Sequence, residues 1–207
     1  MNEVIYFLGM RLEFWTLFLA ITAIVFTGLN DFIIPAIFKP KLRITYSPKE
    51  PYKRATIILS PGSVLSAFDR FKVENIGKVM AKNCRCQIYQ VKNEKEKEID
   101  LQGFPLRWAS RPDAKTDFNK SERLNIGLGE SEFVDLIYMR VDDTTKMFLS
   151  SYHNTPIGIG GSIPIDDYII KAIISGDNFK PYFAIFKIEK KPELNGFKIK
   201  LLEIKRK

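Results

Sequence analysis

The sequence predicts a mainly β protein in which one N-terminal transmembrane helix precedes an antiparallel β-sandwich. Near the start of the chain, residues 14–29 carry no charge and are almost entirely apolar. Beyond residue 40, short segments alternate apolar with polar residues and are bounded by Gly, Pro, Asn and Asp. No stretch of this second part sustains a 3.6-residue apolar period over three turns. Alternation with a period of two indicates strands, and a run of short strands favours a sandwich.

The apolar run lies in residues 14–38, FWTLFLAITAIVFTGLNDFIIPAIF. Its 16 uncharged positions, 14–29, cover about 24 Å as a helix. The span must therefore include Leu12 or residues past Asn30 to cross about 30 Å of hydrocarbon. Trp15 at one end, and Phe38 followed by Lys39 at the other, are typical of a lipid interface. A buried helix of a soluble protein and a cleaved signal peptide are the alternatives, but the run exceeds the usual signal length and lacks a small-x-small site.

The predicted organisation has three parts. Residues 1–38 form a lead-in and the transmembrane helix, residues 39–54 a connector with a possible first strand, and residues 55–207 the β-sandwich domain. Arg11 precedes the span, whereas four cations follow it at Lys39, Lys41, Arg43 and Lys49. Because cytoplasmic flanks carry the excess of Lys and Arg, this balance places the C-terminal domain in the cytoplasm of a single-pass membrane protein.

The first half of the second part contains several expected strands. Leu42, Ile44 and Tyr46 alternate with polar residues, and residues 56–59 precede a Ser-Pro-Gly turn at 60–62. Residues 71–74 alternate until an Asn-Ile-Gly break at 75–77, and the alternation resumes at 84–88, so we expect these two strands to pair. The charged run at 93–98 predicts a solvated hairpin tip.

The second half continues the pattern. Residues 104–108 predict an edge strand or strand start because of Pro105, residues 111–122 a long loop, and residues 124–126 a brief strand before a turn at 127–130. Residues 133–141 are apolar on both faces, which predicts a central strand. Further strands are expected at 147–152, 168–175 and 184–188, with a loop at 153–161. An Asn-Gly turn at 195–196 leads into a last strand, whose phase slips at Leu201 and Leu202 and predicts a β-bulge.

Three segments carry a family resemblance: residues 71–91, FKVENIGKVMAKNCRCQIYQV, residues 124–136, LNIGLGESEFVDL, and residues 168–186. In the first, a strand ending in Asn-x-Gly is followed by a turn, a small residue and the next strand. Together they resemble immunoglobulin-like sandwiches of the CARDB type and cover most of residues 66–190. The resemblance implies a binding or adhesion module without catalytic residues.

Charge and cysteine content limit the function classes. The chain has a net charge of +8, and Arg11 against Glu3, Glu13 and Asp31 leaves residues 1–38 at −2, so the remainder carries +10. A basic domain beside a bilayer is attracted to anionic headgroups, whereas nucleic-acid binding needs a focused patch. The two cysteines, Cys84 and Cys86, stand side by side on one strand face and are expected to be free thiols.

No residue pattern specifies catalysis. His153 is the one histidine and lacks a partner pattern, and two cysteines do not make a structural zinc site. The loop containing Gly158, Gly160 and Gly161 has no following Walker lysine. The Asp142–Asp143 and Asp166–Asp167 pairs read as solvated turns, Asn119 begins an N-glycosylation sequon, and Lys205, Arg206 and Lys207 read as a solvated basic tail.

The expected function is therefore a membrane-anchored, non-catalytic binding or scaffolding module. We assign no catalytic, cofactor-binding or metal-ligating residues and expect no cofactor. The expected partners are the lipid bilayer, through the helix, and a protein bound at an exposed edge strand or loops. Anionic lipid headgroups are a second candidate partner, and nucleic acid is disfavoured. The alternatives are an enzyme accessory or hydrolase built from dispersed carboxylates, and a domain that binds nucleic acid or anionic lipid.

Overall fold

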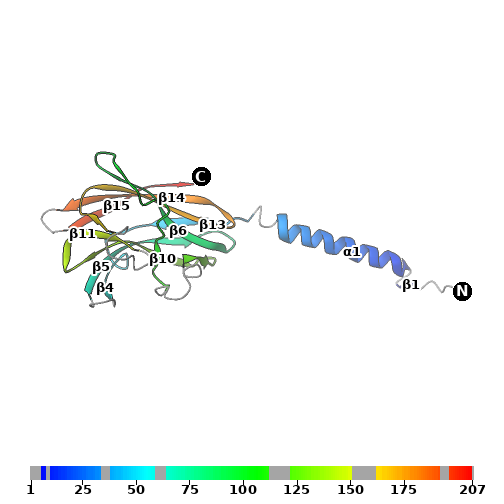
Figure 1. Cartoon of the computed structure of the whole chain (residues 1–207). Coiled ribbons are helices and arrows are strands. Elements are labelled where there is room, and N and C mark those ends of the chain that lie inside the picture. The colour runs from blue at the N-terminus through cyan, green and yellow to red at the C-terminus, as the bar shows by residue number, and fades with distance from the viewer. Residues whose placement is uncertain are drawn as a thin grey trace. The chain divides into compact units, whose positions relative to one another are not determined.

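The computed structural model describes residues 6–7, 10–33, 38–58, 64–111, 122–150, 162–191 and 196–206. The chain divides into two compact units, Met1–Lys39 and Pro40–Lys207. The first contains the apolar helix, and the second contains two stacked antiparallel sheets (Figure 1). A mainly β sandwich preceded by one apolar helix is thus confirmed as the fold class.

The N-terminal unit begins with a short antiparallel ribbon, β1 (Tyr6–Phe7) and β2 (Met10–Arg11). The helix α1 (Leu12–Gly28) follows and continues into a π-helical turn, Leu29–Ile33. Inside the helix, the hydroxyls of Thr22 and Thr27 donate to the carbonyls of Phe18 and Ala23, at 2.8 and 2.9 Å. These bonds satisfy polar groups that lipid would leave without a partner.

Residues Phe14–Asp31 form a helix long and apolar enough to cross a membrane, and none of this window is buried within the protein. Its apolar side chains are exposed on all sides, including Leu17 at 60%, Ile24 at 71% and Phe26 at 61%. A helix that is apolar all round is typical of a membrane span or of a protein core. The absence of burial argues against the core alternative.

Thirteen strands among the described residues build the two sheets of the second unit. Four of them, β7, β8, β9 and β12, are only two or three residues long. The first sheet has the order β12-β11-β10-β5-β3, with β4 also pairing β5 and β8 also pairing β10. The second has the order β15-β14-β13-β6-β7, with β9 also pairing β6.

The strands of the first sheet are β3 (Leu42–Thr45), β4 (Lys53–Ile58), β5 (Val64–Asn75), β8 (Arg107–Trp108), β10 (Ser131–Arg140), β11 (Asp143–Leu149) and β12 (Ser162–Pro164). Those of the second sheet are β6 (Ala81–Asn93), β7 (Glu98–Ile99), β9 (Leu124–Ile126), β13 (Tyr168–Gly176), β14 (Phe179–Lys191) and β15 (Gly196–Arg206).

The predicted pairing of the strands around Phe71 and Cys84 is wrong. These strands are β5 and β6, and they lie in opposite sheets. The connection between them is a crossover whose shape is set by Asn75, a residue with no exposed surface. Its amide donates to the carbonyls of Val79 (2.8 Å) and Ile126 (3.0 Å), and its oxygen accepts the N–H of Gly77 (3.0 Å). These bonds turn the chain out of one sheet and into the other, instead of closing a hairpin.

Other predicted elements are confirmed. β10 lies between β5 and β11, as its two apolar faces indicated, and β13 lies between β6 and β14. The charged run forms the β6–β7 hairpin tip, where the N–H of Asn93 donates to Lys97. In the β14–β15 ladder, Ile185 pairs with Glu203 and Phe186 with Leu201, which leaves Leu202 as the predicted bulge residue. The predicted turns at 60–62 and 195 and the loop at 153–161 lie outside the described residues.

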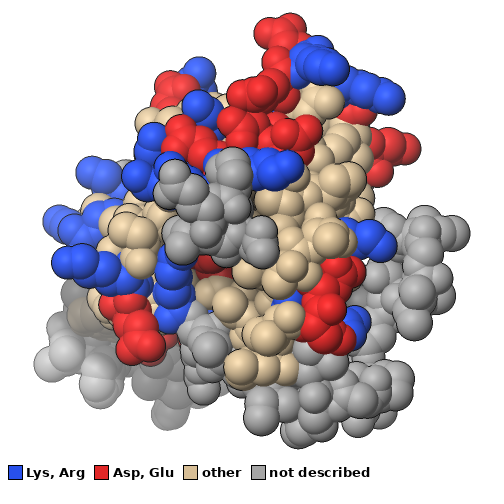
Figure 2. Space-filling model, turned by 90° about the vertical axis from the view of Figure 1, so that its left-hand side faces the viewer, with Lys and Arg blue, Asp and Glu red and all other residues tan. Residues whose placement is uncertain are grey.

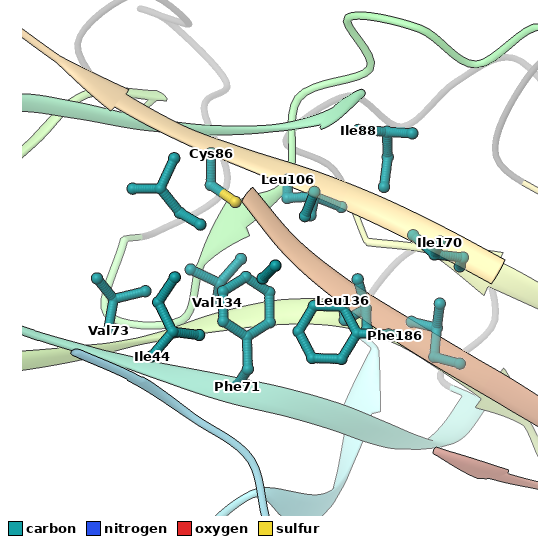
Figure 3. Packing of buried hydrophobic residues seen from close by; sticks show 14 of the residues in the cluster. Ile44, Phe71, Val73, Cys86, Ile88, Leu106, Val134, Leu136, Ile170 and Phe186 are labelled. Carbon is teal, nitrogen blue, oxygen red and sulfur yellow. The ribbon is translucent and has the colours of Figure 1, made fainter. Parts of the chain in front are cut away.

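The core fills the space between the sheets. Figure 3 shows Phe71, Val134 and Leu136 of the first sheet facing Cys86 and Phe186 of the second, and none of these residues is exposed to solvent. The rings of Phe71 and Phe186 meet across the layers, with centroids 5.0 Å apart. Inward residues alternate with outward ones along β13 and β14, as a sheet covered on one face requires.

The strand order is immunoglobulin-like in its centre. β3, β5 and β10 take the places of strands A, B and E, and β6, β13 and β14 those of C, F and G. The chain departs from that plan at two places. The β11–β12 hairpin follows β10 where strand D would lie, and β15 extends the second sheet beyond β14. As a consequence, β3 and β15 are the end strands of their sheets.

Candidate binding groove

A shallow groove, largely open to solvent, lies between the end strands of the two sheets, and we call it the edge groove. It has a volume of about 440 Å³. Its lining comes from the β3 region and from β15: Ile44, Thr45, Tyr46, Pro48, Lys198, Ile199, Lys200 and Leu201. End strands present backbone N–H and C=O groups that their own sheet does not use. The edge groove therefore combines two such edges with side chains from both sheets.

The floor of the edge groove is part of the hydrophobic core. Ile44 and Ile199 are each only 2% exposed, because both point inward from their strands. Leu201 is partly buried and packs against the same core cluster. In a strand, every second side chain points to the same face. If a partner strand were added at one of these edges, its inward side chains would therefore lie on the apolar floor.

One end of the edge groove is built around Tyr46. Its hydroxyl donates to Asp69 (2.9 Å), and its ring meets those of Tyr52 and Phe186 edge to face. Lys53 Nζ lies 3.7 Å from the same carboxylate. Burial raises the pKa of Asp69 despite Lys53 and the hydroxyl, which act in the opposite direction. Burial beside this carboxylate also raises the pKa of Tyr46, so its phenol stays a hydrogen-bond donor.

The β15 wall of the edge groove is basic. Lys200 pairs with Glu189 at 2.9 Å, and Lys187 contacts the same carboxylate at 3.1 Å. The two ammonium groups lower the pKa of Glu189 to about 2, so it is ionised at any physiological pH. Lys198 is exposed and makes no ion pair within the described part of the chain. This wall can therefore attract an anionic group.

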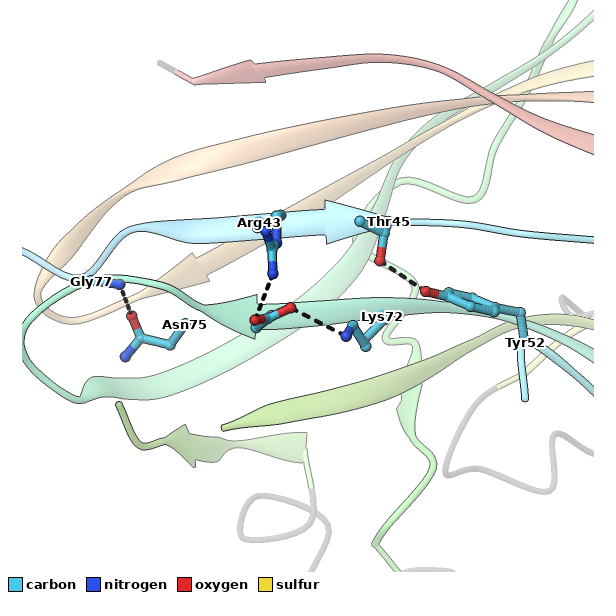
Figure 4. Close-up of polar contacts among 7 residues, drawn as sticks. Arg43, Thr45, Tyr52, Lys72, Asn75 and Gly77 are labelled. Atoms are coloured by element: carbon cyan, nitrogen blue, oxygen red, sulfur yellow. Dashed lines mark hydrogen bonds and ion pairs between the residues drawn. The ribbon is translucent and has the colours of Figure 1, made fainter. Parts of the chain in front are cut away.

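The β3 wall is held rigidly against its sheet. Figure 4 shows Arg43 reaching Glu74 on β5 at 2.7 Å, with Lys72 contacting the same carboxylate at 3.1 Å. These two cations lower the pKa of Glu74. Thr45 and Tyr52 share a hydrogen bond of 3.1 Å on the same face. These bonds fix the side chains of Arg43 and Thr45, and the inward side chain of Ile44 contributes to the floor of the edge groove.

The chemical groups of the edge groove are those of its eight lining residues. Among its lining residues there is no carboxylate, cysteine or histidine. Within the described ranges, no group of three or more His, Cys, Asp or Glu side chains is placed to hold a metal ion. What the lining offers is backbone hydrogen bonding, apolar contact and two ammonium groups.

The cysteines occupy core positions. Cys84 and Cys86 are free thiols with no exposed surface, as the sequence predicted. Burial raises the pKa of Cys84 to about 12 and raises that of Cys86 as well. Both therefore remain protonated at neutral pH, which is the unreactive form of a thiol.

The aspartate pairs lie in turns. Asp142 accepts from Arg140, and Asp143 accepts from the N–H and hydroxyl of Thr145. Asp166 accepts from the N–H of Asp167, and Asp167 accepts from that of Lys190. The candidates His153, Gly158, Gly160, Gly161 and Asn119 lie outside the described residues, as does Lys207. Lys205 and Arg206 belong to β15 and are therefore part of a strand.

The sequence did not predict two ion pairs, one of which is buried on both sides and the other on the carboxylate side only. Arg70 donates to Asp135 at 2.5 Å across β5 and β10, and their side chains are only 10% and 2% exposed. Arg85 donates to Glu122 at 2.7 Å. Asp135 lies in a strand already predicted to be covered on both faces, and a charge in such a strand is the one signal that pointed to a buried partner.

The fold and the edge groove together define a two-sheet, immunoglobulin-like β-sandwich with open edges, preceded by an apolar helix. Comparison of the chain with models of protein families, with curated proteins and with solved structures gives no match. The likeness to CARDB-type domains therefore stays a prediction.

Proposed function

We propose that this protein is a membrane-anchored, non-catalytic binding module. The apolar helix holds it in the bilayer, and the edge groove receives an extended segment of a partner protein. The observation that carries the proposal is the groove itself, because it places the end strands of both sheets on either side of an apolar floor. This role agrees with the binding function that the resemblance to CARDB-type domains implies.

Support for the anchor comes from the surface of the helix. Its apolar side chains are exposed on every side, which in water leaves a large area of hydrocarbon without cover. Insertion into lipid removes this cost, and the internal threonine bonds suit that environment. The excess of Lys and Arg after the span favours a cytoplasmic sandwich.

Support for strand addition comes from the geometry of β15. It is an 11-residue end strand, longer than the typical strand of about 5–6 residues. Four of its residues are cationic, against one acidic residue, Glu203. Lysines on an edge strand oppose pairing with another copy of the same strand, because like charges then face each other. The wall therefore favours a partner segment that is extended and acidic.

Photo-crosslinking tests the partner site. A benzoylphenylalanine replaces Lys198 in the full chain, expressed in membranes of its own cells, and Lys95 is replaced in a matched control. Lys95 is also exposed but lies at the β6–β7 tip, on the far edge of the same sheet. We expect a discrete protein adduct from position 198 that is absent from position 95 and is lost when Lys200→Glu is added. Identical adduct patterns at the two positions would refute the groove as the partner site.

Membrane insertion and orientation have their own test. Alkaline carbonate extraction of the full chain should leave it in the membrane pellet with its N-terminal segment uncut. A Val141→Cys variant then presents an exposed thiol, since Val141 is 60% exposed while both native cysteines are buried. In sealed right-side-out vesicles, an impermeant maleimide should label this thiol only after the vesicles are opened. Labelling of intact vesicles would reverse the proposed orientation.

A further inference from the structure

Four segments meet at the end of the sandwich where the chain enters it from residue 39, and we call this the entry end. The N–H of Ile76 donates to the backbone carbonyl of Lys41, and the N–H of Asn75 donates to the backbone carbonyl of Glu130. The β13–β14 turn joins them, since Asn178 donates to the carbonyl of Met80 at 2.8 Å. The start of β3, the β5–β6 crossover, the β9–β10 turn and the β13–β14 turn therefore form one contiguous surface.

The tips of these segments expose large apolar side chains. Leu128 is 59% exposed, Ile76 42% and Met80 41%. Ile76 and Met80 stand on the β5–β6 crossover and Leu128 on the β9–β10 turn, and backbone hydrogen bonds from Asn75 to Glu130 and from Gly129 to Asn75 hold these two connections together. Single exposed apolar residues need no explanation, but a group of them on neighbouring loop tips marks a surface that contacts something apolar.

Cations lie in the same segments as the apolar tips. Lys41, Lys78 and Lys82 are exposed in or beside the start of β3 and the β5–β6 crossover, and Lys39 is the residue before Pro40 in the chain. The acidic side chains among the same segments are Glu130 and Asp177. Exposed apolar side chains and lysines in the same segments match the two layers of a bilayer surface, in which acyl chains lie beneath charged headgroups.

The opposite end of the sandwich differs. In Figure 2 it carries Lys and Arg intermixed with Asp and Glu around a band of other residues. Val141 is exposed at that end to 60%, in the turn after β10. It is separated from Leu128 by the length of β10, about 30 Å for ten residues. It therefore offers a control with the same exposure at the other end.

We propose that the entry end docks on the surface of the bilayer, with Ile76, Met80 and Leu128 entering the headgroup region and the lysines contacting anionic lipid. The covalent connection supports this occupant. Residues 34–39 join the apolar helix to Pro40 and can extend over at most about 22 Å, so a membrane-inserted helix keeps the entry end within reach of the lipid surface. The inference rests on the proposed membrane anchor, and it concerns a different surface from the edge groove.

The test places an environment-sensitive fluorophore on the full chain in lipid nanodiscs. Leu128→Cys is labelled with a nitrobenzoxadiazole dye, and Val141→Cys is labelled in the same way as the control. Wild type serves as the labelling blank, because Cys84 and Cys86 are buried. We expect blue-shifted emission at position 128, quenched by lipids with a spin label near the headgroup, and water-like, unquenched emission at position 141. Equal emission and quenching at the two positions would overturn the proposal.

Changing the lipid composition and replacing two lysines tests the electrostatic part of the proposal. Discs with phosphatidylserine should increase quenching at position 128 over discs of phosphatidylcholine alone. The Lys39→Gln and Lys41→Gln changes should reduce the ratio of docked to undocked protein by up to roughly fivefold each at low salt. If Leu128→Cys fails to fold, Met80→Cys takes its place. A chain that does not co-purify with nanodiscs refutes the anchor, whereas a chain that co-purifies with an unquenched probe refutes the docking alone.

Discussion

Replacing Asn75 by alanine tests whether a single buried amide holds the two sheets in their observed connection. The side chain makes three hydrogen bonds, to the carbonyls of Val79 and Ile126 and from the N–H of Gly77. Alanine leaves these three backbone groups without their partner at a position that has no exposed surface. An unsatisfied buried polar group costs about 1–3 kcal/mol.

The bond to Ile126 is fully buried, while water can approach the groups at Gly77 and Val79. The full free-energy penalty of an unsatisfied buried group therefore applies to the carbonyl of Ile126, and a smaller penalty applies to the carbonyl of Val79 and the N–H of Gly77. We expect Asn75→Ala to lower the free energy of unfolding by about 3–5 kcal/mol. Urea unfolding of the full chain in detergent measures this, followed by the fluorescence of the core residue Trp108 in a Trp15→Phe background.

Asn178 provides the matched control. Its amide also bonds two backbone groups, the carbonyl of Met80 and the N–H of Lys82, but both bonds are exposed to solvent. Because water can replace the lost partner, Asn178→Ala should cost only about 1 kcal/mol. If the two variants lost the same stability, burial would not be the reason for the effect, and the reasoning about Asn75 would fail.

Three further predictions follow from the same structure. Gly77→Ala should lower the free energy of unfolding by about 1–3 kcal/mol, since the new Cβ would collide with the backbone nitrogen of Lys41. Gly127→Ala is the control, because its Cβ meets only the movable carboxylate of Glu130. In the same urea assay, this variant should lose about 0.5 kcal/mol or less. Asp69→Asn should flatten the pH dependence of the free energy of unfolding. Burial raises the pKa of Asp69 in the folded state, so protonation of this carboxylate at low pH favours folding. Wild type loses that contribution as pH rises through the folded-state pKa. Parallel pH profiles for wild type and Asp69→Asn would contradict this assignment. Iodoacetamide should leave Cys84 and Cys86 unmodified in the native chain and alkylate both in urea, as read by intact mass; rapid native alkylation would show that these thiols are not buried.

Local elements of this fold were predictable because each has a local cause. Alternation located the strands around Ile44, Cys86 and Phe186, and two apolar faces marked β10 as central. The phase slip at Leu202 predicted a bulge because one extra residue must shift every later side chain to the other face. The charged run after Asn93 predicted a hairpin tip because its side chains cannot be buried without partners.

Pairing between strands was not predictable in the same way. Neighbours in sequence were expected to pair, yet β5 and β6 belong to different sheets. The crossover depends on Ile126, a residue 51 positions from Asn75 in the chain. The ion pair of Arg70 with Asp135 joins residues 65 positions apart. Neither contact leaves a periodic signal, because alternation reports which face a residue occupies and not which strand lies beside it.

The sequence alone therefore determined the class of this protein: an apolar helix, then strands with one apolar face, a basic net charge and two unpaired cysteines. Hydropathy and periodicity are properties of neighbouring residues and can be read directly. Only the tertiary structure decided that β3 and β15 end the two sheets and line one groove, and that Ile76, Met80 and Leu128 gather at the entry end. Both surfaces join residues distant in the chain, and they exist only because long-range packing of the sheets brings those residues together.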